Sequence, residues 1–245
     1  MTEHLHIGCA GWSVPGAHAA HFPEDGTHLA RYARRFNMVE INSSFYRPHQ
    51  PKTYAKWAAC VPDNFRFAVK FPRAGTHDAR LHEAEPIIES FASQVHELGD
   101  RLGPVLVQLP PSLAFERDVA EVFFDAMRQH FDGPLVCEPR HPTWFTPAGD
   151  ALWKRFDVAR VAADPARVPE AAIAGGAGPV RYWRLHGAPR VYYDAYGDEG
   201  LRPWAGDIRA AREAGLDCWA VMDNTALGHA TLDAMRLEAM LADVR

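Results

Sequence analysis

Polar and charged side chains stand at the places where apolar runs of this chain end. The sharpest case is Val39–Pro48, where Glu40 and Asn42 close a strand-like run and are followed by two serines, an aromatic pair that includes Tyr46, and an arginine. Charged groups are rarely buried unless they are paired or used chemically. Such an ending makes a poor core and a good pocket rim, so we predict that part of a functional site lies here.

The same kind of ending recurs along the chain. The other polar residues that close or follow apolar runs are Lys70, Gln108, Glu138, Arg140, His141, Asp164, Arg184, His186, Asp223 and Asn224. If the strands are parallel, their carboxyl ends meet on one face, and that face carries the active sites of α/β barrels. We therefore expect these side chains to converge on one pocket.

Three cations among these residues, Lys70, Arg140 and Arg184, suit an anion-binding pocket because such side chains hold phosphate and carboxylate groups. The sequence thus favours an enzyme that acts on a small anionic substrate, phosphorylated or sugar-containing, by acid/base chemistry. The residues assigned to substrate binding are Asn42, Tyr46, Lys70, Gln108, Arg140, His141, Arg184 and Asn224, and those assigned to catalysis are Glu40, Glu138 and His186. Alternatively, the same cations close a buried ion-pair network with Glu40, Glu138 and Asp164, and the two roles are compatible.

Two other functions stay open. A metal-dependent hydrolase or phosphodiesterase would bind a divalent metal through carboxylate and imidazole groups, drawn from Glu40, Glu138, Asp164, Asp223, His141 and His186. The chain has no HExxH spacing, and cations in the same ring would repel a metal, so we predict no resident metal or other cofactor. A non-catalytic module that binds a nucleotide, a nucleic-acid end or a protein is the third hypothesis.

Composition limits the class of protein. The 245 residues are 47% hydrophobic, enough for one large core, and we assign residues 1–245 to a single domain. A net charge of -5 argues against general attraction to nucleic acid or anionic membranes. Four separated cysteines make no CxxC pair, and neither a signal peptide nor a membrane-spanning run is evident. We expect a cytoplasmic protein, and the sequence leaves its oligomeric state open.

Eight short apolar runs bounded by turn residues are predicted to be strands: Leu5–Cys9, Met38–Ile41, Phe65–Lys70, Val105–Leu109, Leu135–Glu138, Val158–Ala162, Val180–Leu185 and Cys218–Met222. Helical patterns between them cover Thr27–Phe36, Glu85–Leu102, Arg117–Phe131, Asp150–Phe156, Asp207–Ala214 and His229–Ala242. This alternation predicts a (β/α)8 barrel of the TIM type, irregular between Asp164 and Pro179, where little helix is expected. An open doubly wound sheet is the alternative, although no GxGxxG motif follows the first strand.

Several motifs together resemble the YecE-like family, a domain of unknown function. They are Cys9–Ser13, Val39–Tyr46, Phe67–Lys70 with Thr76-His77, Gly103–Pro111, Glu138–Trp144, Tyr182–Gly187 and Trp204-Ala205, in order along nearly the whole chain. The resemblance implies a TIM-type barrel whose strand-end residues face a common pocket, and it supplies no reaction or substrate. The chain departs from the family pattern at Asp223, where the first of two asparagines is usual. The link of this fold to metal-dependent barrels that isomerise sugars or cut DNA at abasic sites is analogy alone.

Overall fold

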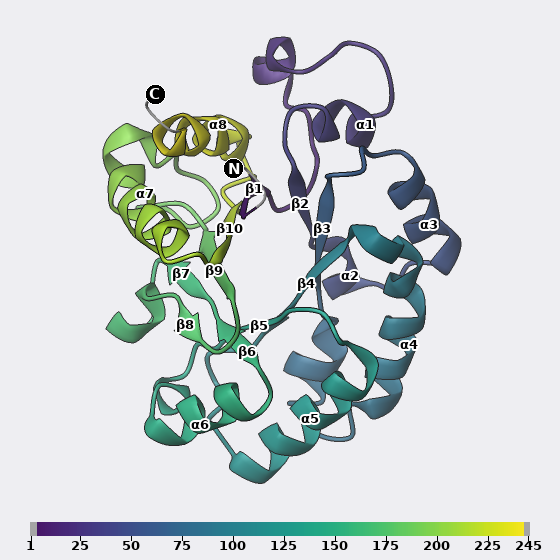
Figure 1. Ribbon diagram of the computed structural model, residues 1–245, viewed down its shortest axis with the longest axis vertical. Coiled ribbons are helices and arrows are strands. Elements are labelled where there is room, and N and C mark those ends of the chain that lie inside the picture. The colour runs from purple at the N-terminus through teal and green to yellow at the C-terminus, as the bar shows by residue number, and fades with distance from the viewer. Residues whose placement is uncertain (1–3, 243–245) are drawn as a thin grey trace.

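The computed structural model describes residues 4–242, and within them the strands form two sheets (Figure 1). One sheet has the order β1 (Leu5–Cys9), β10 (Asp217–Met222), β9 (Val180–Leu185) and β7 (Ala162–Asp164). The other has the order β2 (Met38–Ile41), β3 (Arg66–Lys70), β4 (Leu102–Gln108), β5 (Leu135–Glu138), β6 (Val158–Arg160) and β8 (Gly175–Gly176). All pairings are parallel except that of β6 with β8, so the carboxyl ends of the principal strands point the same way.

The two sheets meet at two places. Ala10, just beyond β1, forms a parallel bridge with Glu40 of β2, and the Gly11 N–H donates to the Glu40 carbonyl oxygen at 3.0 Å. On the other side the chain passes from β6 to β7 through Val161, whose N–H donates to the Cys137 carbonyl oxygen at 2.8 Å. One run of chain therefore serves both sheets, with β6 beside β5 and β7 beside β9.

Helices surround the strands on the outside (Figure 1). They are α1 (His28–Ala33), α2 (Ser43–Tyr46), α3 (Pro51–Ala59), α4 (Glu85–Val95), α5 (Arg117–His130), α6 (Pro147–Arg155), α7 (Gly197–Glu213) and α8 (His229–Leu241). Short helical turns cover Gly16–His21, Ala74–Asp78, His96–Arg101, Pro142–Trp144 and Pro169–Ala172. Helices α3, α4 and α6 each carry proline in the first turn, where its missing N–H removes no helical hydrogen bond.

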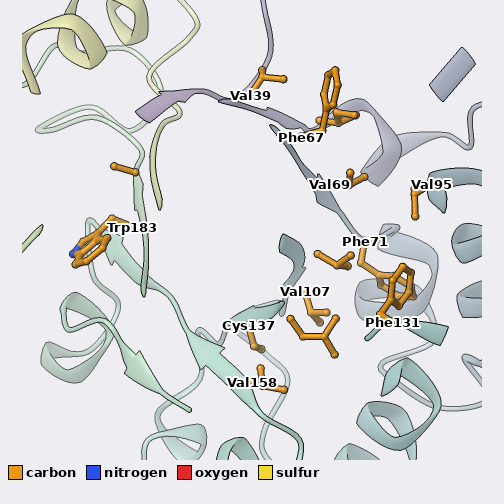
Figure 2. Close-up of a cluster of buried hydrophobic side chains, with 14 of the residues drawn as sticks. Val39, Phe67, Val69, Phe71, Val95, Val107, Phe131, Cys137, Val158 and Trp183 are labelled. Carbon is orange, nitrogen blue, oxygen red and sulfur yellow. The ribbon is translucent and has the colours of Figure 1, made fainter. Parts of the chain in front are cut away.

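The core has two layers because successive side chains of a strand point to opposite faces. On β3, Phe67 and Val69 join a large apolar cluster that packs against the helices, as Figure 2 shows for the labelled residues of this cluster. Ala68, between them, faces a smaller inner cluster built from residues of both sheets, including Leu106 and Tyr182. The inner faces of the two sheets therefore pack against each other.

The expected α/β alternation is confirmed, and each of the eight predicted apolar runs contains a strand. The run Val158–Ala162 is broken at Val161, where the chain changes sheets. The predicted helix Glu85–Leu102 ends at Val95 and continues as a 3-10 turn, because Gly99 adopts a positive φ of 52° and Leu102 already begins β4.

Other boundaries also differ from the sequence-based prediction. Helix α3 was not predicted, although Tyr54, Trp57 and Ala58 follow helical spacing in it. Helix α7 begins at Gly197 rather than Asp207, and the additional turns contain Pro203, a residue that disfavours the interior of a helix. The segment between Asp164 and Pro179 holds a short helical turn and β8 instead of a full helix, as expected. None of the helices within residues 4–242 combines the length and the apolar character needed to cross a lipid bilayer.

Candidate functional site

A polar layer lies directly above the inner apolar cluster. On the inner faces, Met38, Ala68, Leu106, Val136, Tyr182 and Val221 belong to the apolar cluster, and the residues two positions further along the same strands are Glu40, Lys70, Gln108, Glu138, Arg184 and Asp223. Because a step of two residues keeps a side chain on the same face, the pleat sets these groups around one space at the carboxyl ends of the strands. All six are buried.

Arg184 occupies the centre of this polar cluster and is fully buried. Its Nη2 donates to Glu40 Oε1 and to Asp223 Oδ2, both at 2.9 Å, and its Nε donates to Glu40 Oε2 at 3.1 Å. Its Nη1 donates to Glu138 Oε2 at 2.7 Å and faces His186 Nε2 at 3.4 Å. Four of the five guanidinium N–H groups are thus engaged with carboxylates of the protein, which is the ion-pair alternative rather than an open anion clamp.

Glu138 accepts hydrogen bonds from several donors. Gln108 Nε2 lies 3.0 and 2.9 Å from its two carboxylate oxygens, and Arg140 Nε lies 2.7 Å from Oε1. Burial by itself raises the pKa of Glu138, but Arg140 and Arg184 outweigh it and hold the pKa well below its usual range. Glu138 is therefore a carboxylate at neutral pH, a weak base that is suited to stabilise positive charge.

His186 forms an acid–imidazole pair with Asp223. Its Nδ1 lies 2.9 Å from Asp223 Oδ2, and its Nε2 lies 3.6 Å from Glu138 Oε1. Burial and the Arg184 charge lower the pKa of His186, but its hydrogen bonds with Asp223 and Glu138 raise it above the ordinary value overall. His186 thus holds its proton to a higher pH than an ordinary histidine, which favours a role as a general acid.

Lys70 stands apart from these ion pairs. Its side chain is 6% exposed, and its Nζ lies 4.1 Å from the centroid of the Phe45 ring. Within residues 4–242 this amine forms no ion pair and donates no hydrogen bond. Burial, helped by the Arg184 charge, lowers the pKa of Lys70 to about 8, although the three nearby carboxylates act in the opposite direction.

A pocket of about 460 Å³ opens beside the cluster. It is lined by Glu138, Pro139, Arg140, Ala163, Pro165, Ala166, Arg167, Ala171, His186, Val191 and Tyr192. The Tyr192 ring stands edge-on to the His186 ring, with centroids 5.7 Å apart. The pocket thus presents two guanidinium groups and the protonatable imidazole of His186 to an incoming molecule.

Four predicted site residues belong neither to the cluster nor to the lining of this pocket, and two of them lie at other parts of the surface. Asn42 lines a separate cavity of about 350 Å³ with Trp12 and His28. Tyr46 is 73% exposed on α2 and packs edge-on against Phe45.

Two further predicted residues have roles that the local structure accounts for. His141 Nδ1 lies 2.9 Å from Thr143 Oγ1 and caps the turn that begins at Pro142. Asn224 Nδ2 donates to Asp233 Oδ2 at 2.8 Å, which ties the end of β10 to α8.

Sequence reasoning missed Tyr182 and Arg167, and it placed Asp223 at the strand ends without a role. Tyr182 donates its hydroxyl to Glu40 Oε2 at 2.8 Å, and its spacing of two from Arg184 was a signal for the same face. Asp223, whose role was left open, binds both Arg184 and His186. Arg167 reaches the pocket from an irregular segment, and no periodic pattern could have indicated it.

The six residues considered as metal ligands do not share one place. Asp164 accepts the Tyr196 hydroxyl at 2.6 Å, His141 turns toward Thr143, and the guanidinium of Arg184 lies among the remaining carboxylates. Among residues 4–242, no group of three or more histidine, cysteine, aspartate or glutamate side chains is arranged to hold a metal ion.

The fold and the site together define an α/β protein of mostly parallel strands with a buried cluster of mixed charge at their carboxyl ends. The chain belongs to the family described as "Protein of unknown function DUF72", whose model matches residues 6–245.

The chain is similar to the UPF0759 protein YecE of Escherichia coli K12, with 31% identity over 143 residues, which are 58% of this chain and 50% of YecE. It is 26% identical over 152 residues to the UPF0759 protein YunF of Bacillus subtilis 168, covering 58% of this chain and 53% of YunF. The match thus spans about half the length of these curated relatives. The resemblance to the YecE-like family is confirmed.

Solved structures support the same fold. A DUF72 family protein of Enterococcus faecalis V583 superposes with a TM-score of 0.80 at 18% identity, over 98% of this chain and 96% of that chain. A DUF72 family protein of Thermotoga maritima MSB8 gives a TM-score of 0.77 at 21% identity, over 97% and 99% of the two chains. At these identities the likeness concerns the fold and carries no activity.

Proposed function

We propose that this protein is an enzyme that acts on a small anionic substrate, phosphorylated or sugar-containing, by acid/base chemistry in the pocket beside His186. The observation that carries the proposal is the Asp223–His186–Glu138 arrangement at the wall of a pocket that also holds Arg140 and Arg167. A protonated imidazole beside an ionised carboxylate and two guanidinium groups provides both proton transfer and anion binding.

The scaffold of the proposal is a single-domain TIM-type barrel. The bridge between Ala10 and Glu40 on one side and the shared run through Val161 on the other support closure of the two sheets around one axis. The inner apolar cluster, drawn from both sheets, supports it as well. In such barrels the carboxyl ends of the strands carry the chemistry.

Each group has a role in the proposal. His186 donates a proton to an oxygen of the substrate, and the ionised carboxylate of Glu138 stabilises the positive charge of the imidazolium. Arg140 and Arg167 hold the anionic group, with Lys70 as a further positive charge at the same end of the strands. Arg184 keeps the carboxylates of Glu40, Glu138 and Asp223 in place, because its donors are already engaged.

The proposed reaction uses no resident metal. This part of the proposal is supported by the guanidinium of Arg184, which lies among the carboxylates that a metal would need. The four cysteines are free thiols, which suits the reducing conditions of the cytoplasm, where we place the enzyme. Elemental analysis of protein purified without chelator tests the metal assignment, and stoichiometric zinc, manganese or iron would contradict it.

The experiment is a thermal-shift screen with matched pairs: glucose 6-phosphate against glucose, ribose 5-phosphate against ribose, and orthophosphate alone. We expect the phosphorylated members to raise the melting temperature, because a ligand that binds only the folded state stabilises it. Arg140→Ala should abolish the shift. Arg202→Ala, at an exposed position of α7, should leave it unchanged and is the matched control.

Compounds that stabilise the protein are then followed by ¹H and ³¹P NMR for conversion. His186→Gln should lower the rate by about 100-fold or more and keep the thermal shift, since general acid catalysis contributes on that scale. A ligand that stabilises the protein and is never altered would make the protein a binding module instead. An equal response to phosphorylated and unphosphorylated members, or turnover unchanged in Glu138→Gln and Arg140→Ala, would refute the assignment of the pocket.

A further inference from the structure

We propose that Lys70 is a nucleophile that binds its substrate covalently as an imine, so that the substrate is an anionic aldehyde or ketone, such as the open-chain form of a sugar phosphate. This inference rests on the proposed function and names the substrate class of the polar cluster, which contains Lys70 and borders the pocket without Lys70 lining it.

The position of Lys70 is the first argument. It closes β3 on the inner face, one pleat above Ala68 of the inner apolar cluster and beside the carboxylates held by Arg184. Buried ammonium groups in proteins are almost always paired. The amine of Lys70 is not, because Arg184 and Arg140 take the nearby carboxylate oxygens and Lys70 forms no ion pair within residues 4–242.

The surroundings of the amine are the second argument. The Phe45 ring covers one side of Nζ at 4.1 Å, which excludes water from that side. The positive charges of Lys70 and Arg140 both lower the pKa of His77, so these two cations and His77 are neighbours. A largely buried amine near the Arg184 cation is the environment in which lysines act as imine-forming nucleophiles.

The protonation state supports the same role. With a pKa of about 8, roughly one-tenth of the Lys70 side chains carry a neutral amine at pH 7. An ordinary lysine, with a pKa near 10.4, has only about 4 in 10,000 side chains neutral at this pH. Lys70 therefore presents the reactive form a few hundred times more often than an exposed lysine.

Imine formation at Lys70 begins with attack of the amine on the carbonyl carbon of the substrate. The lone pair of neutral Nζ attacks the carbonyl carbon, a C–N bond forms, and the π electrons move to the carbonyl oxygen, which takes a proton from His186. The carbinolamine nitrogen, which now carries a positive charge, returns one proton to the imidazole of His186 and so regains its lone pair. His186 passes that proton to the carbinolamine hydroxyl, and water leaves as the nitrogen lone pair forms the C=N bond, so that one proton is taken up overall. The product is a protonated imine, and its formation consumes no oxidant or reductant.

The test uses glycolaldehyde phosphate as the probe, with sodium cyanoborohydride as the hydride donor that reduces the imine to a stable secondary amine. The chain has four lysines, Lys52, Lys56, Lys70 and Lys154, so peptide mass spectrometry compares all four in one sample of folded wild-type protein. We expect Lys70 to be labelled at least tenfold faster than each of the other three. Unphosphorylated glycolaldehyde should label Lys70 more slowly than the phosphorylated probe.

Two variants check the assignment. Lys70→Arg keeps a positive charge and cannot form an imine, so the fast label should disappear, with folding verified by the melting temperature. Lys154→Arg is the matched control and should leave the fast label in place. If Lys70 in the folded wild-type protein reacts no faster than Lys52, Lys56 and Lys154, the inference is wrong.

The inference and the proposed function can fail separately. If Lys70 is not labelled fast but phosphate still gives a thermal shift that depends on Arg140, the anion pocket is supported and imine formation at Lys70 is refuted. If Lys70 is labelled equally fast by the phosphorylated and unphosphorylated probes, and Arg140→Ala does not change the rate, imine formation is supported and the anion pocket is refuted.

Discussion

The guanidinium of Arg184 binds the carboxylate of Glu40 in a bidentate manner, with Nη2–Oε1 at 2.9 Å and Nε–Oε2 at 3.1 Å, across a sequence separation of 144 residues. This pair joins β9 of one sheet to β2 of the other. Burying two charges costs about as much desolvation free energy as their attraction returns, but removing one partner is strongly destabilising. The pair therefore fixes the relative position of the two sheets at the candidate site.

Arg184→Met should lower the free energy of unfolding by about 3–5 kcal/mol at neutral pH, because three buried carboxylates would lose their shared cation. In the wild-type protein Glu138 and Asp223 have lowered pKa values, so their contribution to stability is present above the unfolded pKa near 4 and is lost as the pH falls. In the variant, protonation of these carboxylates at lower pH would remove the cost of burying unpaired charges. The difference in the free energy of unfolding between wild type and variant should therefore become smaller toward pH 5.

Urea unfolding at pH 7.5 and pH 5 measures this effect, with Arg202→Met at an exposed position as the control. A loss of stability that is the same at the two pH values would show that the carboxylates do not depend on Arg184.

Lys70→Met should stabilise the protein by about 1–3 kcal/mol at pH 7.5, even though the substitution removes a proposed functional group. The pKa of Lys70 in the folded protein, about 8, lies below its ordinary value of 10.5. Between these values the unfolded chain binds more protons, so the cost of the buried ammonium is fully present below pH 8 and declines as the pH rises. The advantage of the variant should therefore shrink at pH 9.5.

Urea unfolding of Lys70→Met at pH 7.5 and 9.5 is the measurement, and Lys154→Met is the exposed control. A variant less stable than wild type at pH 7.5, or an advantage that does not depend on pH, would argue against the desolvated amine.

Asp223→Asn should lower the pKa of His186, because the substitution replaces the negative partner of the imidazolium with a neutral amide. His186 has a raised pKa in the folded protein, so its contribution to stability is full below the unfolded pKa of about 6.5 and is lost as the pH rises through the raised value. NMR titration of the imidazole signals compares the two proteins, with Asp198→Asn as the exposed control. An unchanged titration curve would mean that Asp223 does not set the charge of His186.

Gly8→Ala should destabilise the protein by at least about 2 kcal/mol, because overpacking at this point forces the backbone apart. A Cβ at Gly8 would lie 2.2 Å from the Met38 carbonyl oxygen and 2.8 Å from the Tyr32 hydroxyl, which holds β1 and β2 together. Thermal unfolding measures the loss. Gly16→Ala, where a Cβ would meet nothing within 4 Å, should have little effect, and equal behaviour of the two variants would contradict the close approach.

Much of the fold could be predicted because the apolar runs are short, bounded by turn residues and separated by helical patterns. Runs such as Val105–Val107 are apolar throughout, as strands covered on both faces are. The break at Val161 could not be predicted, because a change of sheet depends on which neighbours a strand meets and leaves the hydrophobic pattern intact.

The sequence by itself determined which residues could form the site. A spacing of two along a strand places Glu138 above Val136 and Arg184 above Tyr182 on the same inner face, and this follows from local backbone geometry.

Only the tertiary structure decided how these charges are used. It engages four of the five donors of Arg184 with carboxylates and leaves the amine of Lys70 without an ion pair among residues 4–242. It also directs His141 and Asn224 to structural contacts. The physical reason is that pairing depends on strand register and on distances between segments far apart in the chain, and no local pattern encodes those distances.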